Sequence, residues 1–367
     1  MNIISQYEPL IGYSEKEAMA EYMNNPGFLT EYKKTEEFEK QITNTIGVKY
    51  CSVVNNGTIS LSLGLIALGI KPGDKVIVPD ITMIATINAV KFIGAIPVLC
   101  DVNENILLDL DKAVTLIRND SEIRAVIIVS LNGRAHLSEI YGFKAICDEH
   151  KVKVLGDDAQ SFGSKNYEDK FIGTCVSDIS SFSFSMPKII TTGQGGALIS
   201  QDANLAQTIK KLKDFGRSSG GNDKHDYFGI NSKFTEMQAV IGIEQLKDIK
   251  YRIQRKKELY SLYYNELKDV SSVKFINYNV PCWTPWFVDV FVKDKQELQQ
   301  YLKDKGIGSR SIYPAIHTQA VYPEYNDMYF PKSSRLADTG LWLPSSFTLT
   351  DSDVIYICES IKEFYHV

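Results

Sequence analysis

The chain has 367 residues, of which 44% are hydrophobic and 23% charged, a balance typical of a soluble globular protein with a large core. Its formal net charge of -5, without a sustained basic run, argues against a nucleic acid or an anionic membrane surface as a partner. No apolar window approaches the roughly 20 residues that a membrane-spanning helix requires.

The first half of the chain alternates helical patterns with short apolar runs. We expect strands at residues 50–54, 76–78, 96–100, 125–129 and 152–155. We expect helices at residues 33–46, 58–68, 84–92, 110–118 and 140–150. Apolar strands separated by helices predict an α/β fold, in which helices cover both faces of a largely parallel sheet.

The pattern changes in the second half. Two more strands are expected at residues 179–184 and 197–200, and one long helix at about 235–267. The remainder mixes a strand at 288–292 with helices at 295–305 and 351–366, which predicts a smaller α+β part. We therefore expect a large domain over residues 1–245 and a small carboxyl-terminal domain over residues 246–367.

Cysteine usage and the first residues indicate the compartment. The six cysteines are scattered without a CxxC pair, which argues against a structural zinc site and predicts reduced thiols and no metal. Residues 1–8 lack a positive leader followed by an apolar stretch, so no signal peptide is expected. Together these features predict a cytoplasmic protein.

Two segments follow predicted strands and carry polar groups. Gly57 and Thr58 open a helix, whose first N–H groups can bind an anion, although such a pair is also an ordinary helix start. Asp157 ends a strand, at the sheet edge where ligands gather in parallel sheets. Its carboxylate can keep a heterocyclic nitrogen protonated, and a helix cap formed with Asp158 is the alternative.

A third segment presents one lysine in an unusual setting. Lys188 lies between a strand and the glycine turn at 193–196, among apolar and hydroxyl side chains, and Pro187 restrains the loop before it. Desolvation there disfavours the charged amine and favours a nucleophile. A fourth segment, residues 229–239, runs into the long helix and would by itself be an ordinary loop and cap.

The order of these segments resembles the DegT/DnrJ/EryC1/StrS group of sugar aminotransferases, which are fold-type I enzymes dependent on pyridoxal 5'-phosphate. The resemblance covers almost the whole chain. It rests on NGT at 56–58, PGDKVIVP at 72–79, DDAQ at 157–160, SFSMPK at 183–188, GQGG at 193–196 and NSKFTEMQA at 231–239. Residues 131–134, 214–217 and 313–319 look most like the members that make a GDP-linked amino sugar.

The resemblance implies a role for each matching residue. Lys188 matches the lysine that holds the cofactor as a Schiff base and then moves the proton between substrate and cofactor. Asp157 matches the partner of the pyridine nitrogen, and Gln160 the residue near the cofactor's 3-hydroxyl.

Further positions match ligands of the cofactor's phosphate. Gly57, Thr58 and Ser183 match ligands from the same chain, whereas Asn231 matches one that the neighbouring subunit donates. The resemblance therefore implies a homodimer with a shared active site.

The chain departs from the family pattern at several positions. Met83 stands where an aromatic residue usually stacks on the cofactor ring, although a thioether can also cover a ring face. Asp158 replaces a small residue and Ile189 an asparagine. Residues 28–32 lack the glycine-rich turn common beside the sugar pocket. The cofactor residues are thus retained, while the substrate side differs.

These implications predict an aminotransferase. The expected donor is an amino acid, L-glutamate in the family, and the expected acceptor is a nucleotide-linked keto-deoxysugar for surface polysaccharide synthesis. Arg217 and His317 are candidates for substrate binding, with a surface arginine and a structural loop histidine as the alternatives. The altered pocket leaves a phosphorylated three-carbon ketone as a second possible acceptor.

Two other classes of protein share the fold. Sugar 3-dehydratases of related sequence carry histidine at the lysine position, and Lys188 argues against that reaction. A cofactor-binding regulator would add a DNA-binding region, and no basic helix-turn-helix pattern is found in the sequence.

Overall fold

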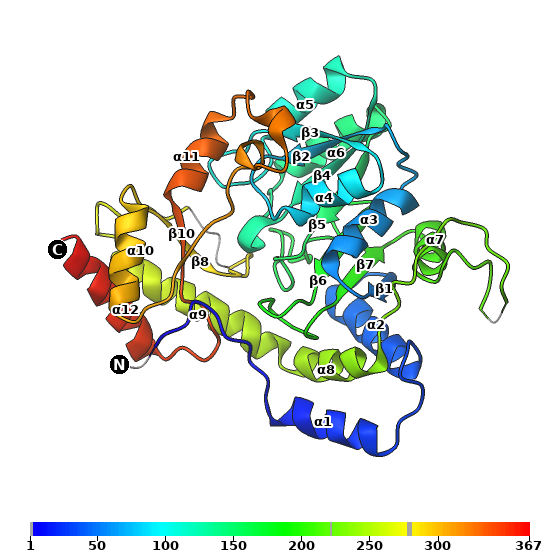
Figure 1. Ribbon diagram of the computed structural model, residues 1–367, viewed down its shortest axis with the longest axis horizontal. Coiled ribbons are helices and arrows are strands. Elements are labelled where there is room, and N and C mark those ends of the chain that lie inside the picture. Colours follow the sequence, from blue (N-terminus) through cyan, green and yellow to red (C-terminus); the bar gives the residue numbers. More distant parts are fainter. Residues whose placement is uncertain (1–2, 221, 277–280) are drawn as a thin grey trace.

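The computed structural model describes residues 3–220, 222–276 and 281–367. Figure 1 shows a large part built around a sheet and a smaller part that includes the carboxyl terminus. The helices α8 (Glu236–Lys247) and α9 (Ile249–Leu267) run from one part into the other. No helix in the described ranges combines the length and the apolar character needed to cross a membrane.

Over these residues the large part contains one seven-stranded sheet, in the order β1-β7-β6-β5-β4-β2-β3. Its strands are β1 (Tyr50–Val54), β2 (Lys75–Pro79), β3 (Ile96–Cys100), β4 (Ile123–Val129), β5 (Lys153–Asp157), β6 (Ile179–Ser183) and β7 (Gly196–Ser200). All pairs are parallel except those that β7 makes with β1 and β6. The predicted α/β fold with a mostly parallel sheet is confirmed.

Helices cover both faces of this sheet because strand side chains alternate between two apolar layers. Val76 and Val78 of β2 pack into the layer formed with α3 and α4, whereas Ile77 between them packs into the layer formed with α5 and α6. The helices of the large part are α1 (Tyr13–Asn24), α2 (Lys33–Ile46), α3 (Gly57–Ala67), α4 (Ala85–Phe92), α5 (Leu110–Asn119), α6 (Glu139–Glu149) and α7 (Ala203–Lys213).

The predicted helices of the first half agree with α2 to α6 within one residue at each end. Helix α1 was not predicted, because Glu15 is its one fully buried residue and it therefore shows no apolar stripe. The single long helix expected over residues 235–267 is wrong. Asp248, with φ -96° and ψ 9°, ends α8 and precedes α9, because its backbone leaves the helical region.

The smaller part has its own sheet and core. Its antiparallel sheet has the order β8-β10-β9. Its elements after α9 are β8 (Val288–Phe291), α10 (Lys295–Asp304), β9 (Arg310–Ser311), α11 (Pro331–Thr339), β10 (Gly340–Leu343) and α12 (Asp351–Phe364). Ile4 near the amino terminus pairs with Ile307 of this part. The domain boundary after residue 245 stays a prediction, since α8 and α9 follow one another across it.

Gly242 in α8 offers a test of the packing behind the sheet. A Cβ added there would lie 2.5 Å from Cζ of Phe38, a fully buried ring that packs against Phe184 and Phe234. Overpacking a core typically costs about 1–3 kcal/mol, more than the roughly 1 kcal/mol that alanine adds to helix propensity. We therefore expect Gly242→Ala to lower the free energy of unfolding in urea titrations.

Gly142 in α6 is the matched control, because nothing lies within 4 Å of a Cβ added there. Gly142→Ala should raise the free energy of unfolding by about 0.5–1 kcal/mol. Equal effects of the two substitutions would contradict this account of the α8 contact.

Candidate active site

A cavity of about 700 Å³ lies at the carboxyl ends of β5 and β6. This is the edge of a parallel sheet where ligands are expected. Seven residues predicted to contact the cofactor line the cavity together, namely Gly57, Thr58, Met83, Asp157, Gln160, Ser183 and Lys188. They come from four separate segments of the sequence, so the fold brings together positions that are up to 131 residues apart.

Lys188 lies in the loop after β6, and its amine contacts an indole ring. Its Nζ atom is 4.2 Å from the ring centroid of Trp286. Part of the side chain faces the cavity and the rest is enclosed by protein. Burial lowers the pKa of the Lys188 amine to about 8, and the negative charge of Asp157 opposes this shift. A substantial fraction of the amine is therefore neutral near pH 8 and able to act as a nucleophile or base.

Asp157, at the end of β5, is a buried carboxylate in the same cavity. Its Oδ2 atom accepts a hydrogen bond of 2.7 Å from the Thr86 hydroxyl, and Oδ1 accepts one of 3.3 Å from the Ala159 N–H. Burial raises the pKa of the Asp157 carboxyl, while these hydrogen bonds and the charge of Lys188 oppose the rise. The carboxylate is thus fixed in direction and well placed to accept a proton from a ligand.

The start of α3 lies at the cavity wall, and the N–H groups of a helix start are suited to an anion. Asn56 caps the helix by accepting from the Ile59 N–H at 2.9 Å, and Gly57 and Thr58 of the first turn line the cavity. The Ser183 hydroxyl lies beside this turn, and a Cβ at Gly57 would be 2.9 Å from Cβ of Ser183. The close approach therefore requires a glycine at position 57.

Gln160 is held by two neighbours in the cavity wall. Its Oε1 atom accepts from the Asn132 N–H at 2.7 Å, and its Nε2 atom donates to the Tyr313 hydroxyl at 3.1 Å. Asn132 has φ 55°, and its side-chain amide both donates to and accepts from the backbone of Phe287. These bonds connect the large part with the segment that carries Trp286.

Among the lining residues that were not predicted as site residues, three come from the smaller part: Trp286, Arg310 and Tyr313. Tyr313 lies in a segment that the family resemblance had marked, so that resemblance was an available signal. Trp286 and Arg310 lie in a loop and a two-residue strand of the smaller part, where no periodicity points to a ligand. Their place in the cavity follows from how the two parts pack.

Asp158 lies outside this cavity, although it is next to Asp157. Its side chain is buried, and Oδ1 accepts from the hydroxyls of Ser130 at 2.6 Å and Ser161 at 3.2 Å. It lines a separate small cavity of about 40 Å³ together with His136. Burial, with a contribution from the charge of Asp157, raises the pKa of the Asp158 carboxyl to about 6. The second carboxylate therefore cannot contact a ligand beside Lys188.

The remaining predicted site residues do not line the cavity within this single chain. The Nη1 atom of Arg217 donates to the carbonyl of Asn222 at 2.7 Å. The Nδ1 atom of His317 lies 2.6 Å from Oδ2 of Asp80. Asn231 is exposed and forms a bridge with Asp214. The substrate roles of Arg217 and His317 and the intersubunit role of Asn231 stay predictions.

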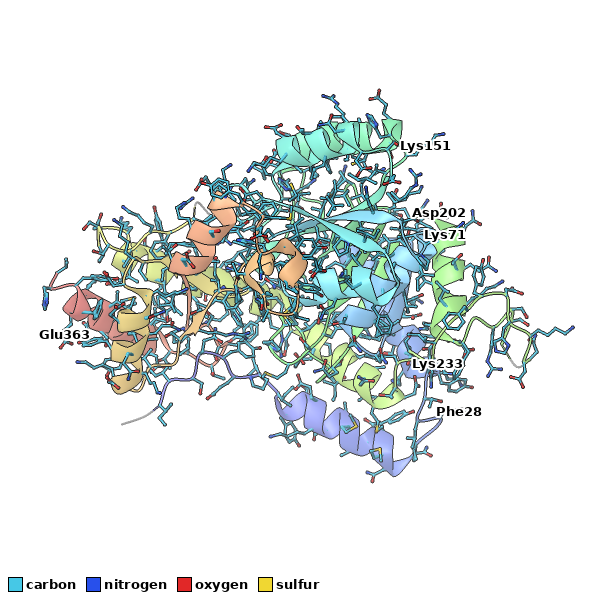
Figure 2. All side chains as sticks on the ribbon, turned by 45° about the horizontal axis from the view of Figure 1, so that its top comes forward. Phe28, Lys71, Lys151, Asp202, Lys233 and Glu363 are labelled. Atoms are coloured by element: carbon cyan, nitrogen blue, oxygen red, sulfur yellow. The ribbon has the colours of Figure 1, made fainter. Side chains whose placement is uncertain are left out.

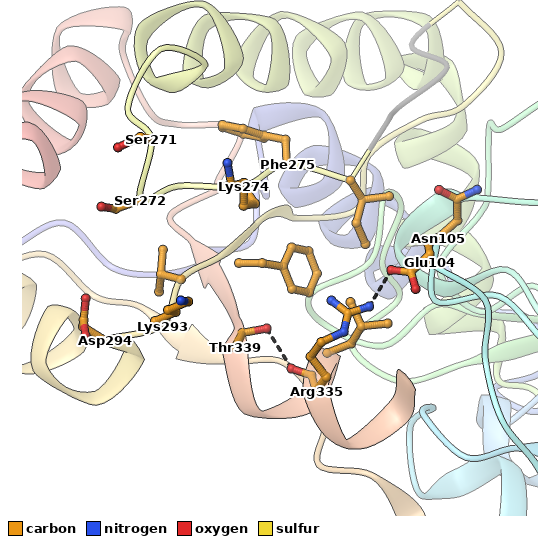
Figure 3. Close-up of a pocket in the computed structure, with 14 residues that line it drawn as sticks. Glu104, Asn105, Ser271, Ser272, Lys274, Phe275, Lys293, Asp294, Arg335 and Thr339 are labelled. Atoms are coloured by element: carbon orange, nitrogen blue, oxygen red, sulfur yellow. Dashed lines mark hydrogen bonds and ion pairs between the residues drawn. The ribbon is translucent and has the colours of Figure 1, made fainter. Parts of the chain in front are cut away.

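The region that departs from the family pattern near the amino terminus also lies elsewhere. Phe28 is 64% exposed, and Figure 2 shows it at the outer surface below the sheet. A second hollow of about 670 Å³ lies between the two parts (Figure 3). It contains the Arg335–Glu104 ion pair but no predicted site residue. Among the described residues no cluster of three His, Cys, Asp or Glu side chains is placed to hold a metal ion.

The chain is similar to known proteins over nearly its whole length. The sequence matches the profile of the DegT/DnrJ/EryC1/StrS aminotransferase family over residues 9–362. It is 33% identical to GDP-perosamine synthase of Escherichia coli O157:H7, covering 100% of this chain and 99% of that protein. It is 29% identical to GDP-perosamine synthase of Vibrio cholerae, covering 99% and 100% respectively.

Solved structures share the fold. Helicobacter pylori PseC, an aminotransferase involved in the biosynthesis of pseudoaminic acid, superimposes with a TM-score of 0.91 at 23% identity and covers 100% of both chains. DesV of S. venezuelae superimposes with a TM-score of 0.89 at 26% identity, covering 96% of this chain and 94% of that one.

The lowered pKa of Lys188 predicts a change of stability with pH in the cofactor-free protein. Between the folded value of about 8 and the ordinary value of 10.5, the unfolded chain binds a proton that the folded chain does not. The cost of burying Lys188 therefore grows as the pH falls from 10.5 to 8 and is constant below. We expect Lys188→Met to be more stable than the wild type by up to about 3 kcal/mol at pH 7, a gap that closes by pH 10.5.

Urea titrations across this pH range measure the difference. Lys71→Met, at an exposed lysine, should show a pH dependence equal to that of the wild type. If the stability of Lys188→Met depended on pH as that of the wild type does, a lowered pKa of the Lys188 amine would be excluded.

Proposed function

This chain belongs to the DegT/DnrJ/EryC1/StrS aminotransferase family, and we propose that it transfers the amino group of L-glutamate to a nucleotide-linked keto-deoxysugar for surface polysaccharide synthesis. That it is a pyridoxal-phosphate-dependent aminotransferase follows from the family. The observation that carries the choice of acceptor is the full-length similarity to GDP-perosamine synthases from two organisms. A spore coat polysaccharide biosynthesis protein of Bacillus subtilis, SpsC, is 28% identical over 97% of this chain.

The cavity residues fit pyridoxal phosphate. The first turn of α3, with the hydroxyls of Thr58 and Ser183, suits a phosphate, while the Asp157 carboxylate suits a protonated ring nitrogen. The amine of Lys188, with its lowered pKa, suits a covalent link to an aldehyde. When bound, the cofactor supplies an electron sink for the carbon that loses its proton.

The chain's own groups then perform the proton chemistry. With the cofactor bound, Asp157 would hold the proton on the ring nitrogen, because a buried carboxylate pairs strongly with a cation. We propose that the Nζ atom of Lys188 removes the proton from the donor carbon and later delivers one to the acceptor carbon. The thioether of Met83, at the cavity wall, would cover one face of the cofactor ring.

Arg310 is our candidate for recognising an anionic group of the donor. With Lys188 it supplies the cationic side chains of the cavity wall, among the described residues. Its guanidinium carbon lies 5.6 Å from the ring centroid of Trp342, and no carboxylate of the described ranges forms an ion pair with it. A guanidinium in this position is suited to pair with a carboxylate in a two-point contact.

We further propose a homodimer in which Asn231 reaches the neighbouring cavity. Support comes from its exposed position, outside the cavity of its own chain, and from the family resemblance. A phosphorylated three-carbon ketone is the alternative acceptor, supported by the changed residues Met83 and 28–32 on the substrate side.

The proposed function predicts that Lys188→Ala lacks the visible absorption band of the linked cofactor and loses amine transfer. The loss should be at least about 10²–10⁴-fold, since both nucleophile and proton carrier are removed. Glutamate-dependent product formation from a GDP-linked keto-deoxysugar and from a three-carbon keto-phosphate measures it, with Lys71→Ala as control. Undiminished transfer by the Lys188 variant would refute the mechanism, whereas wild-type activity on the keto-phosphate alone would refute the proposed acceptor.

Arg310→Gln should raise the KM for the amino donor about 10–100-fold, which corresponds to the loss of one charged hydrogen-bonding contact. The visible spectrum of the bound cofactor should not change, because Arg310 is placed toward the substrate. Arg310→Lys keeps a point charge, so its KM for the amino donor should lie between those of the wild type and Arg310→Gln. If the KM for the acceptor rises instead, the guanidinium serves the acceptor and the donor assignment is wrong.

A further inference from the structure

Lys256 of α9 is a buried lysine that the proposed mechanism does not use. It is 2% exposed, and its Nζ atom donates a hydrogen bond of 2.8 Å to the carbonyl of Trp286 and another to the carbonyl of Ser345. The rings of Phe347, Tyr7 and Phe287 surround it, with centroids 4.7, 5.4 and 5.7 Å from Nζ. These three rings are called the aromatic cage below.

The cage is unusual because no carboxylate balances the amine. In the described ranges Lys256 has no ion pair, whereas Arg252, one turn earlier on the same helix, lies 3.7 Å from Glu15. Burial lowers the pKa of the Lys256 amine to about 7. Burying an amine that has only carbonyl and ring partners is unfavourable, because the charged form loses its hydration. We therefore expect a role for Lys256 in the contacts that it makes.

Two residues that contact Lys256 also hold the loop of the catalytic lysine. The indole Nε1–H of Trp286 donates to the carbonyl of Pro187 at 2.6 Å, and the hydroxyl of Tyr7 donates to the carbonyl of Lys188 at 3.4 Å. The same indole ring lies 4.2 Å from Nζ of Lys188. The consecutive carbonyls of Pro187 and Lys188 are therefore bonded to side chains of two aromatic residues that also contact Lys256.

We propose that Lys256 is a positioning residue for Lys188: by holding the backbone of Trp286 and the ring of Tyr7, it keeps the catalytic amine against the indole and away from water. The inference rests on the proposed role of Lys188. Without Lys256 the carbonyls of Trp286 and Ser345 lose their donor, and water can enter beside the indole. The amine of Lys188 is then better solvated, and its pKa moves back toward its ordinary value.

Charged and titratable groups around both lysines do not offer another explanation for such a shift. Asp157 on β5 is the carboxylate that acts on Lys188, and it is unchanged in every variant. Arg310 of the small part lines the same cavity and stays charged throughout the pH range used. Burial raises the pKa of the phenols of Tyr7 and Tyr313, so both remain neutral. Arg252 and its partner Glu15 are unchanged in every variant.

The test follows the uptake of pyridoxal 5'-phosphate by the cofactor-free full-length protein. The rate at which the visible band forms depends on the neutral fraction of Lys188, so its pH midpoint reports the pKa of that amine. We expect a midpoint near 8 in the wild type, and a rise of about one pH unit in Lys256→Met. The kcat for amine transfer should fall about tenfold, with little change in the KM for either substrate.

Two further variants complete the experiment. Lys256→Arg keeps the charge and the donors, and should restore most of the wild-type midpoint. Lys257→Met is the matched control on the next residue, because the Lys257 amine donates to the carbonyl of Pro281 and has no contact with the cage. Its midpoint should equal that of the wild type.

The outcomes separate this proposal from the function itself. A wild type that takes up no cofactor would refute the proposed function. If the wild type takes up the cofactor and the folded Lys256→Met variant shows the same pH midpoint, the positioning role alone would be overturned. If Lys256→Met does not fold, Trp286→Phe tests the positioning role instead. This substitution removes the hydrogen bond to the Pro187 carbonyl and leaves Lys256 in place. Its midpoint should rise, and an unchanged midpoint would overturn the proposal.

Discussion

The burial of one amine and one carboxylate in the wall of a single cavity is the constraint on which the rest of the structure depends. Lys188 and Asp157 each lose hydration there, and each loss disfavours the charged form of the group. Their mutual attraction and a small number of hydrogen bonds offset part of the cost. The same low-dielectric surroundings make the pair useful, because an amine that can lose its proton and a carboxylate that can hold one are the requirements of proton transfer.

The parallel sheet supplies the geometry for this pair. β5 and β6 are neighbours, so Asp157 at the end of β5 and the loop that follows β6 reach the same edge. Asp158 directly follows the last residue of β5, and it does not line the cavity that Asp157 lines. The first carboxylate faces the cavity, and the second faces the hydroxyls of Ser130 and Ser161 on the other side. Adjacent residues of the same type thus have different surroundings, because different segments of the chain pack against each of them.

The smaller part completes the site by closing one side of it. Trp286 and Tyr313 come from that part, and they contact Lys188 and Gln160 of the larger one. A buried ion pair between Arg134 and Asp289, with an N–O distance of 2.6 Å, joins the two parts behind this contact. The junction is therefore polar as well as apolar, which favours a single arrangement of the two parts over a loosely packed one.

The sequence by itself determined most elements of the large part and several residues at their ends. Short apolar runs and helical periodicity located β1 to β5 and α2 to α6, because local burial patterns depend on positions close together in the chain. The motifs around Gly57, Asp157 and Lys188 predicted a cofactor cavity, and these residues do line one cavity. Only the tertiary structure decided the break at Asp248, the orientation of Asp158 and the contacts of Trp286, Arg310 and Lys256. Each of these depends on which segments distant in the sequence pack together, and no pattern within a single segment contains that information.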